Sequence, residues 1–142
     1  MIGWAFSQMT DDRRQTTKSL PVALVEYLAM WNSADLDEAR VHMERSVAED
    51  MIFADPRDFH VGRDALMQNV RRFKRAFPDA VLGLRSGVDG QNNRYRYEWR
   101  IAQGDSVILD GFDVTTLNDE GLIERVDGFF GEIPPMGDVR SV

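Results

Sequence analysis

The stretch GFDVTTLNDEGLIERVDGFFGE, residues Gly111–Glu132, decides the fold of this chain. It contains the end of one β-rich run, Val107–Leu117, and the whole of a second, Leu122–Phe130, with the turn-forming sequence NDEG between them. This pattern predicts a β-hairpin. The first run carries an acidic residue, Asp113, although both faces of an extended strand are mainly apolar there. We therefore expect the carboxyl group of Asp113 to be desolvated.

Further β-rich runs lie upstream of this hairpin. Ala80–Val88 and Arg94–Gln103 alternate with turn-forming residues, so we expect them to continue the hairpin as an antiparallel meander. A shorter run, Met51–Ala54, ends at Asp55-Pro56, because the residue before a proline is pushed toward extended geometry. The pattern predicts one early strand and four late ones.

Three helices are predicted before the meander. Apolar side chains recur at helical spacing over residues 20–31, and Asp35 followed by Glu38 resembles a capping box that opens a second helix. A third helix follows Gly62 and stops at Pro78. Helices first and mainly strands afterwards predict an α+β domain, with the helices packed on one face of a curved sheet.

The composition excludes several classes of protein. The 142 residues include 17 Lys and Arg against 24 Asp and Glu, which gives a formal net charge of −7. Because the basic residues are scattered among acidic ones, we expect no nucleic acid partner. Without cysteine the chain has no disulfide or thiol nucleophile, which fits a reducing, cytoplasmic compartment. No apolar run approaches the ~20 residues of a membrane span, so we expect no membrane partner.

The regular signals predict a single domain. We expect it to cover residues 19–134, after a partly disordered leader at 1–18 and before a tail at 135–142. Trp4 and Phe6 in the leader could dock on the body or on a second subunit.

The order of elements resembles the nuclear transport factor two-like superfamily, which includes ketosteroid isomerase and the SnoaL-like polyketide cyclases. The resemblance covers residues 21–132, and its most specific piece is the closing hairpin quoted above. The segment YLAMWNSADLD resembles the end of the family's first helix and the start of its second, and FADP resembles its first strand. It implies a cone-shaped antiparallel sheet of the cystatin-like type, with helices on its concave face. The open end of such a cone is a pocket for a small apolar molecule.

Ketosteroid isomerase uses a tyrosine on the first helix, an aspartate before a proline, and an aspartate on the strand before the last turn. Tyr27, Asp55 and Asp113 stand at the matching positions. The resemblance implies a cofactor-independent isomerase for a small cyclic carbonyl compound. Asp55 would carry the proton, while Tyr27 and Asp113 would stabilise the enolate oxygen, which is the chemistry such a proton transfer needs.

Aromatic side chains are expected to complete the pocket wall. The chain supplies Trp31 at the end of the first helix, Phe53 on the first strand and Phe130 at the end of the last strand. We expect these three residues to contact an apolar or cyclic carbonyl ligand.

The strand Arg94–Gln103 alternates charged and aromatic side chains. Counting back from Asp113 through the turn at Gly104 places Arg96 and Glu98 on the pocket side, where they would bind a polar ligand. An arginine close to Asp113 would favour its ionised form and abolish its role as a donor.

The other assignment for this strand turns its aromatic face toward the pocket or the core. Tyr95, Tyr97 and Trp99 could instead form a dimer surface. The resemblance implies a homodimer through the outer sheet face, for which these rings would be anchors.

Two alternative functions remain open. Each candidate residue has a structural explanation, Tyr27 as core and Asp55 as turn, so the chain could be a non-catalytic ligand-binding or dimerisation module. Epoxide hydrolysis is a further alternative, since Arg96-Tyr97-Glu98 resembles half of the limonene epoxide hydrolase arrangement. The second carboxylate of that arrangement is missing, because Gly128 occupies its place.

One short segment contains several possible metal ligands. Asp55, Asp58 and His60 lie together in DPRDFH. A loop with only one histidine is a weak set of ligands, so we expect no metal site and place His60 at the pocket rim or surface.

Overall fold

The computed structural model describes residues 20–138. The helices are α2 (Val22–Trp31), α3 (Leu36–Ser46) and α4 (Arg63–Ala76), followed near the end by a 3-10 turn (Met136–Asp138). The strands are β1 (Val47–Ala54), β2 (Phe59–Val61), β3 (Val81–Leu84), β4 (Asp89–Gln91), β5 (Arg94–Gln103), β6 (Ser106–Leu117) and β7 (Ile123–Phe130). The predicted leader, with Trp4 and Phe6, lies outside the described residues.

The three predicted helices are confirmed, and local chemistry explains where they begin and end. At the start of α3, Asp35 Oδ1 accepts from the Glu38 backbone N–H at 2.8 Å, while Glu38 Oε2 accepts from the Ala34 N–H at 3.0 Å. This reciprocal pair is a variant of the predicted capping box, in which the glutamate accepts from the residue before the N-cap. Helix α4 ends just before Pro78, which cannot continue it. Among residues 20–138, no helix is long and apolar enough to span a membrane.

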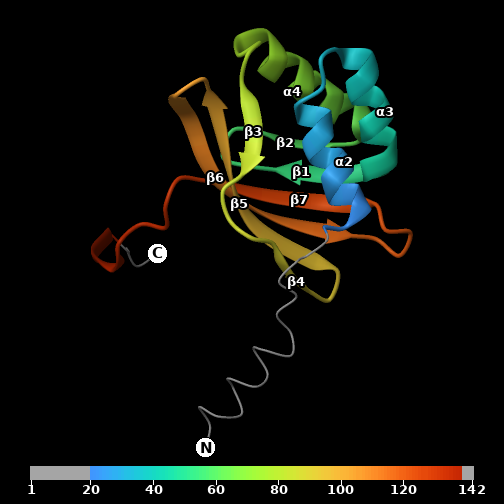
Figure 1. Ribbon diagram of the computed structural model, residues 1–142. Helices are drawn as coiled ribbons and strands as arrows, with labels where there is room; N and C mark the ends of the chain where they lie inside the picture. The colour runs from blue at the N-terminus through green and yellow to red at the C-terminus, as the bar shows by residue number, and fades with distance from the viewer. Residues whose placement is uncertain (1–19, 139–142) are drawn as a thin grey trace, which may run out of the picture.

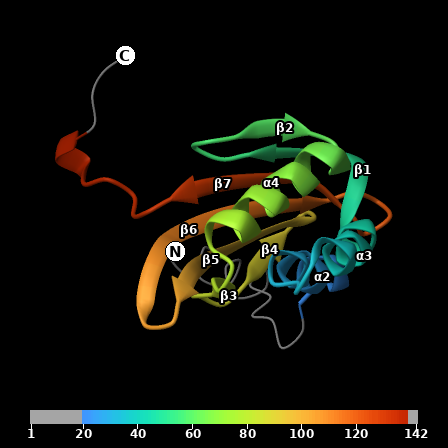
Figure 2. The same ribbon diagram turned by 90° about the horizontal axis from the view of Figure 1, so that it is seen from above.

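The strands form one curved, open sheet in the order β2-β1-β7-β6-β5-β3, and β4 also pairs with β5 (Figure 1). Neighbouring strands are antiparallel except for β1 and β7, which are parallel, so the sheet is mixed rather than purely antiparallel. Helix α4 runs over the sheet, and α2 and α3 lie beside each other at one end (Figure 2). The α+β fold with helices inside the curve of the sheet is confirmed.

Two short strands occupy segments that the sequence suggested were loops. β2 pairs with β1 in the segment after Pro56, and β4 lies where a long turn was predicted. The actual turn between β4 and β5 is Asn92-Asn93, whose φ angles of 46° and 65° suit a two-residue hairpin. The first strand also begins at Val47, four residues before Met51.

A bulge between β5 and β6 decides which face of β5 points inward. Ala102 pairs with Val107, but Ile101 pairs with Leu109, so Ile108 is an extra residue without a partner across the strands. A single extra residue shifts the register and reverses the facing of every side chain beyond it.

The predicted placement of Arg96 and Glu98 on the pocket side is therefore wrong. Tyr97, not Arg96, pairs with Asp113 across the two strands. Arg96 and Glu98 are exposed on the opposite face, where Arg96 Nε lies 2.8 Å from Asp89 Oδ1. The count through the turn at Gly104 failed because it assumed a regular ladder.

The same bulge corrects the predicted dimer anchors. Tyr97 and Trp99 are only 2% and 7% exposed and belong to the main core with the apolar residues of α2 and β7. Tyr95 packs against that core as well. None of the three rings is available to a partner on the outer sheet face.

Candidate functional site

A cavity of about 430 Å³ lies between the helices and the inner face of the sheet. Tyr27, Asp55 and Asp113 all line it, although they come from α2, the end of β1 and the middle of β6. The cavity wall is mainly apolar, and its aromatic residues include Trp31, Phe53, Phe73, Phe77, Trp99 and Phe130. All predicted site residues are thus brought together except Arg96 and Glu98, which lie outside the cavity.

Asp113 is buried at the inner end of this cavity, and only 8% of it is exposed. The Trp99 Nε1–H donates to Asp113 Oδ1 at 2.8 Å, and the Tyr97 hydroxyl lies 3.4 Å from Oδ2. Trp99 can approach because Gly111 lies opposite it; a Cβ atom on Gly111 would lie 2.0 Å from the indole ring. The sheet therefore holds the carboxyl group between two aromatic donors.

Burial raises the pKa of Asp113 to about 7. The hydrogen bonds from Trp99 and Tyr97 lower this pKa but do not cancel the desolvation, and the nearby charge of Asp55 raises it further. Close to neutral pH, Asp113 is thus present in both its neutral and ionised forms. Only the neutral form can donate a hydrogen bond to a ligand.

Tyr27 is buried on the inward side of α2. Burial raises the pKa of its phenol well above 10, and the charges of Asp113 and Asp55 act in the same direction. Its ring packs edge-on against Trp31 at a centroid distance of 6.3 Å. Tyr27 therefore keeps its proton at neutral pH and is a hydrogen-bond donor on the cavity wall.

Asp55 lies just after β1, in a different environment. Its Oδ1 accepts from the backbone N–H groups of Arg57 and Asp58, both at 2.8 Å, in a turn that fixes the carboxylate at the cavity edge. The side chain is partly exposed rather than buried. Such a carboxylate is an acceptor and can take up a proton.

Gly128 of β7 lies between the two acids. A Cβ atom there would lie 2.9 Å from Asp113 Oδ1 and 3.4 Å from the Cβ atom of Asp55, so the position suits only glycine. The neighbouring Asp127 pairs with Arg125 at 2.9 Å and does not line the cavity. A second carboxylate of the epoxide hydrolase type is therefore absent from this strand of the cavity.

The sequence alone left Tyr97 and Trp99 as the second of two assignments for the cavity side and did not assign Thr115 to the site. The Tyr97 hydroxyl is 2.7 Å from Thr115 Oγ1, and both groups are buried beside Asp113. The aromatic side chains of this strand recur at every second residue, so the sequence indicated that they share one face. This face is the inner one because of the bulge at Ile108, which nothing in the sequence predicted.

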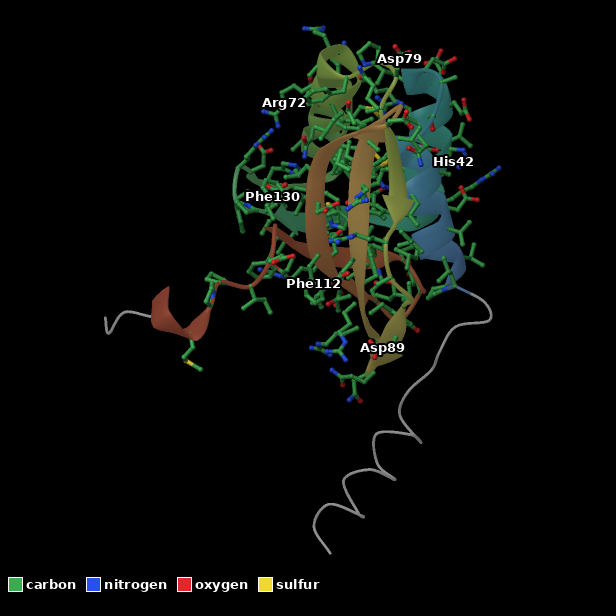
Figure 3. All side chains as sticks on the ribbon, turned by 60° about the vertical axis from the view of Figure 1, so that its left-hand side comes forward. His42, Arg72, Asp79, Asp89, Phe112 and Phe130 are labelled. Carbon is green, nitrogen blue, oxygen red and sulfur yellow. The ribbon has the colours of Figure 1, made fainter. Side chains whose placement is uncertain are left out.

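Charged and polar side chains line the mouth of the cavity. Arg72 Nη2 lies 3.0 Å from Asp58 Oδ1, and the Arg57 guanidinium lies 5.8 Å from the centre of the Phe130 ring. Arg72 and Phe130 lie on the same side of the molecule (Figure 3). Asn69 also belongs to this mouth.

His60 lies beside the cavity but does not line it. Its ring stacks on Phe53 at 4.8 Å, and Nε2 lies 3.5 Å from Asn69 Nδ2. Burial lowers its pKa, so the ring is neutral at pH 7. Within residues 20–138, no group of three or more His, Cys, Asp or Glu side chains is arranged to hold a metal ion.

Comparison with known proteins identifies the family to which this fold belongs. Residues 24–126 match the SnoaL-like domain family. The chain belongs to this family. No curated protein matches the SnoaL-like chain in sequence.

Solved structures agree with this assignment. A proposed isomerase of the SnoaL-like family from Agrobacterium tumefaciens is 30% identical, with a TM-score of 0.72 over 78% of this chain and 95% of that one. A proposed polyketide cyclase from Sinorhizobium meliloti is 18% identical, with a TM-score of 0.63 over 77% and 94% of the two chains. A cystatin-like protein from Silicibacter pomeroyi, also 18% identical, has a TM-score of 0.60 over 81% and 77%. The last two share the fold of the SnoaL-like chain.

Proposed function

We propose that this SnoaL-like protein is an acid–base enzyme that moves a proton between two carbon atoms of a small cyclic carbonyl compound. The observation that carries the proposal is the convergence of Tyr27, Asp55 and Asp113 on one mainly apolar cavity. The name of the Agrobacterium tumefaciens relative, an isomerase, points in the same direction.

Asp55 is the proposed base. It removes the proton from the carbon next to the carbonyl group, which leaves the electron pair as an enolate, and then returns the proton to a second carbon. Its turn holds one carboxylate oxygen through two backbone donors, so the other oxygen can face the ligand in a fixed direction.

Tyr27 and neutral Asp113 are the proposed donors to the enolate oxygen. Both pKa values are raised chiefly by burial, which favours the protonated form of each group where negative charge develops. In an apolar cavity, such preorganised donors stabilise the charge more than water does.

Proton exchange tests this proposal directly. A panel of cyclic ketones, including a 3-oxo-Δ5-steroid, is incubated with the protein in D2O, and deuterium entry beside the carbonyl group is followed by proton NMR. We expect exchange of at least one ketone to fall by at least about 100-fold in Asp55→Asn.

Asp105→Asn is the matched control, because Asp105 is exposed in the turn between β5 and β6 and does not line the cavity. It should exchange at the wild-type rate. Equal exchange in wild type and Asp55→Asn would contradict the role of Asp55. Absence of exchange with every ketone, together with binding of a phenol, would favour the non-catalytic ligand-binding module.

We also propose a homodimer through the outer sheet face, with anchors different from those suggested by the sequence. Phe59 and Phe129 are 68% and 59% exposed, and Phe129 pairs across the strands with Phe112. Burying such rings against a second copy would stabilise a dimer. Sedimentation should show a dimer that Phe129→Glu dissociates and Val41→Glu, on the outside of α3, does not. A monomeric wild type would contradict this.

A further inference from the structure

Arg57 lies at the mouth of the cavity, close to an aromatic ring. Its guanidinium carbon is 5.8 Å from the centre of the Phe130 ring, and both residues line the cavity. The Phe130 ring in turn packs edge-on against Trp99, whose indole holds Asp113. A charged group at the mouth is thus connected to the inner acid by two aromatic rings in contact.

The other charges at the mouth are engaged within the protein. Asp58 pairs with Arg72 at 3.0 Å, and Asp55 accepts two backbone N–H groups. The side chain of Arg57 turns toward the Phe130 ring instead of toward either neighbouring carboxylate, and within residues 20–138 its guanidinium makes no ion pair. Its planar set of N–H donors therefore stays available to a molecule in the cavity.

The charge balance limits what that molecule can be. The formal charges of Asp55, Arg57, Asp58 and Arg72 sum to zero and Arg72 is paired with Asp58, so the mouth offers an anion one guanidinium and no excess of positive charge. A single free guanidinium suits a singly charged carboxylate, which it can bind through two parallel hydrogen bonds.

We propose that the ligand of this cavity carries a carboxylate that Arg57 binds at the mouth, while its ring system fills the aromatic wall and its carbonyl oxygen faces Tyr27 and Asp113. This inference rests on the proposed function, because it names the substrate class of the same site. It makes Arg57 a specificity-determining residue that selects a cyclic keto acid over a neutral ketone.

The test compares two rigid phenols, 6-hydroxy-2-naphthoate and its methyl ester, which share the same ring system and differ in one negative charge and one methyl group. Both are titrated into the full-length protein at pH 6 by calorimetry, since the carboxylate is ionised there and Asp113 is largely neutral. We expect the acid to bind at least about tenfold more tightly than the ester.

Arg57→Met keeps an unbranched apolar side chain that can still cover Phe130 but removes the charge. We expect it to weaken binding of the acid by about tenfold and to change binding of the ester by less than about twofold. Arg75→Met is the matched control, because Arg75 is exposed on α4 and does not line the cavity. It should leave both affinities unchanged.

Equal affinity for acid and ester, equal weakening of both by Arg57→Met, or the same loss in Arg75→Met would each overturn the inference. Binding of the ester without preference for the acid rejects the keto acid and leaves the proposed proton transfer intact. Failure of both compounds to bind rejects the inference as well. The proton-exchange comparison of wild type with Asp55→Asn decides the proposed function separately.

Discussion

The inner end and the mouth of the cavity use the same side chain, aspartate, in opposite environments. Asp113 is buried between Trp99 and Tyr97, and burial raises its pKa to about 7. Asp55 is partly exposed and is fixed by backbone donors. The difference teaches that a buried position on the sheet can supply a neutral acid, while a partly exposed turn directly before Pro56 supplies an acceptor held by backbone N–H groups.

The two regions also differ in how tightly they are packed. Around Asp113, the glycines of β6 and β7 leave no room for a Cβ atom. At the mouth, Arg57 and Arg72 are exposed and can adjust to a ligand. We therefore expect substitutions at the inner end to change stability and substitutions at the mouth to change binding.

The largest expected effect comes from filling the space at the inner end. Gly111→Ala places a methyl group where Trp99 lies, and we expect it to lower the free energy of unfolding by about 3 kcal/mol. Urea denaturation measures this loss. Gly83→Ala on β3 is the control, because no heavy atom lies within 4 Å of the added methyl position. If both variants lost the same stability, the packing contrast would be wrong.

The next effect concerns pH. Since the pKa of Asp113 is raised in the folded chain, the unfolded chain binds fewer protons between about pH 4 and pH 7, and stability falls as pH rises through this interval. Between pH 5.5 and 7, the contribution of Asp113 should fall by about 2 kcal/mol.

Asp113→Asn isolates this contribution, because other titrating groups such as His60 remain in both proteins. The difference in unfolding free energy between variant and wild type should move by about 2 kcal/mol in favour of the variant from pH 5.5 to 7. A difference that does not depend on pH would show that Asp113 is already ionised at pH 5.5.

A smaller effect is expected from removing one donor at the inner end. Trp99→Phe keeps an aromatic six-membered ring but loses the N–H that donates to Asp113 Oδ1. We expect the pKa of Asp113 to rise, since this hydrogen bond lowers it, and the stability at pH 7 to fall by about 1 kcal/mol. An unchanged or lower pKa would mean that Trp99 does not hold the carboxyl group.

Much of the fold and the convergence of the three candidate residues on one cavity could be predicted from the sequence. Capping, proline and turn signals act over a few residues, so they located the helices and the hairpin around Asn118. The spacing of Tyr27, Asp55 and Asp113 matched a family arrangement, and the structure brings them to one cavity. These features depend on local chemistry or on a resemblance along the chain.

The facing of β5 could not be predicted, because it depends on one unpaired residue in the adjoining strand. Ile108 is an ordinary apolar residue, and nothing in its type indicates a bulge. Short strands such as β2 and β4 were missed for a related reason: three residues are too few to show a period, and pairing with a neighbour creates them.

The smallest expected effect tests this correction. Arg96→Met combined with Glu98→Gln changes two exposed side chains on the outer face. We expect stability to change by less than about 0.5 kcal/mol and the affinity for 6-hydroxy-2-naphthoate to stay the same. A loss of affinity in this double variant would indicate that Arg96 and Glu98 face the cavity.

The proposed mechanism depends most on a proton that Asp113 holds at the inner end of the cavity near neutral pH. Carbon-13 NMR of protein labelled at the aspartate carboxyl groups follows each titration between pH 5.5 and 8.5. We predict one carboxyl signal with a midpoint of about 7 that disappears in Asp113→Asn. If every aspartate were already fully ionised at pH 5.5, Asp113 could not donate to an enolate, and the proposed mechanism would be contradicted.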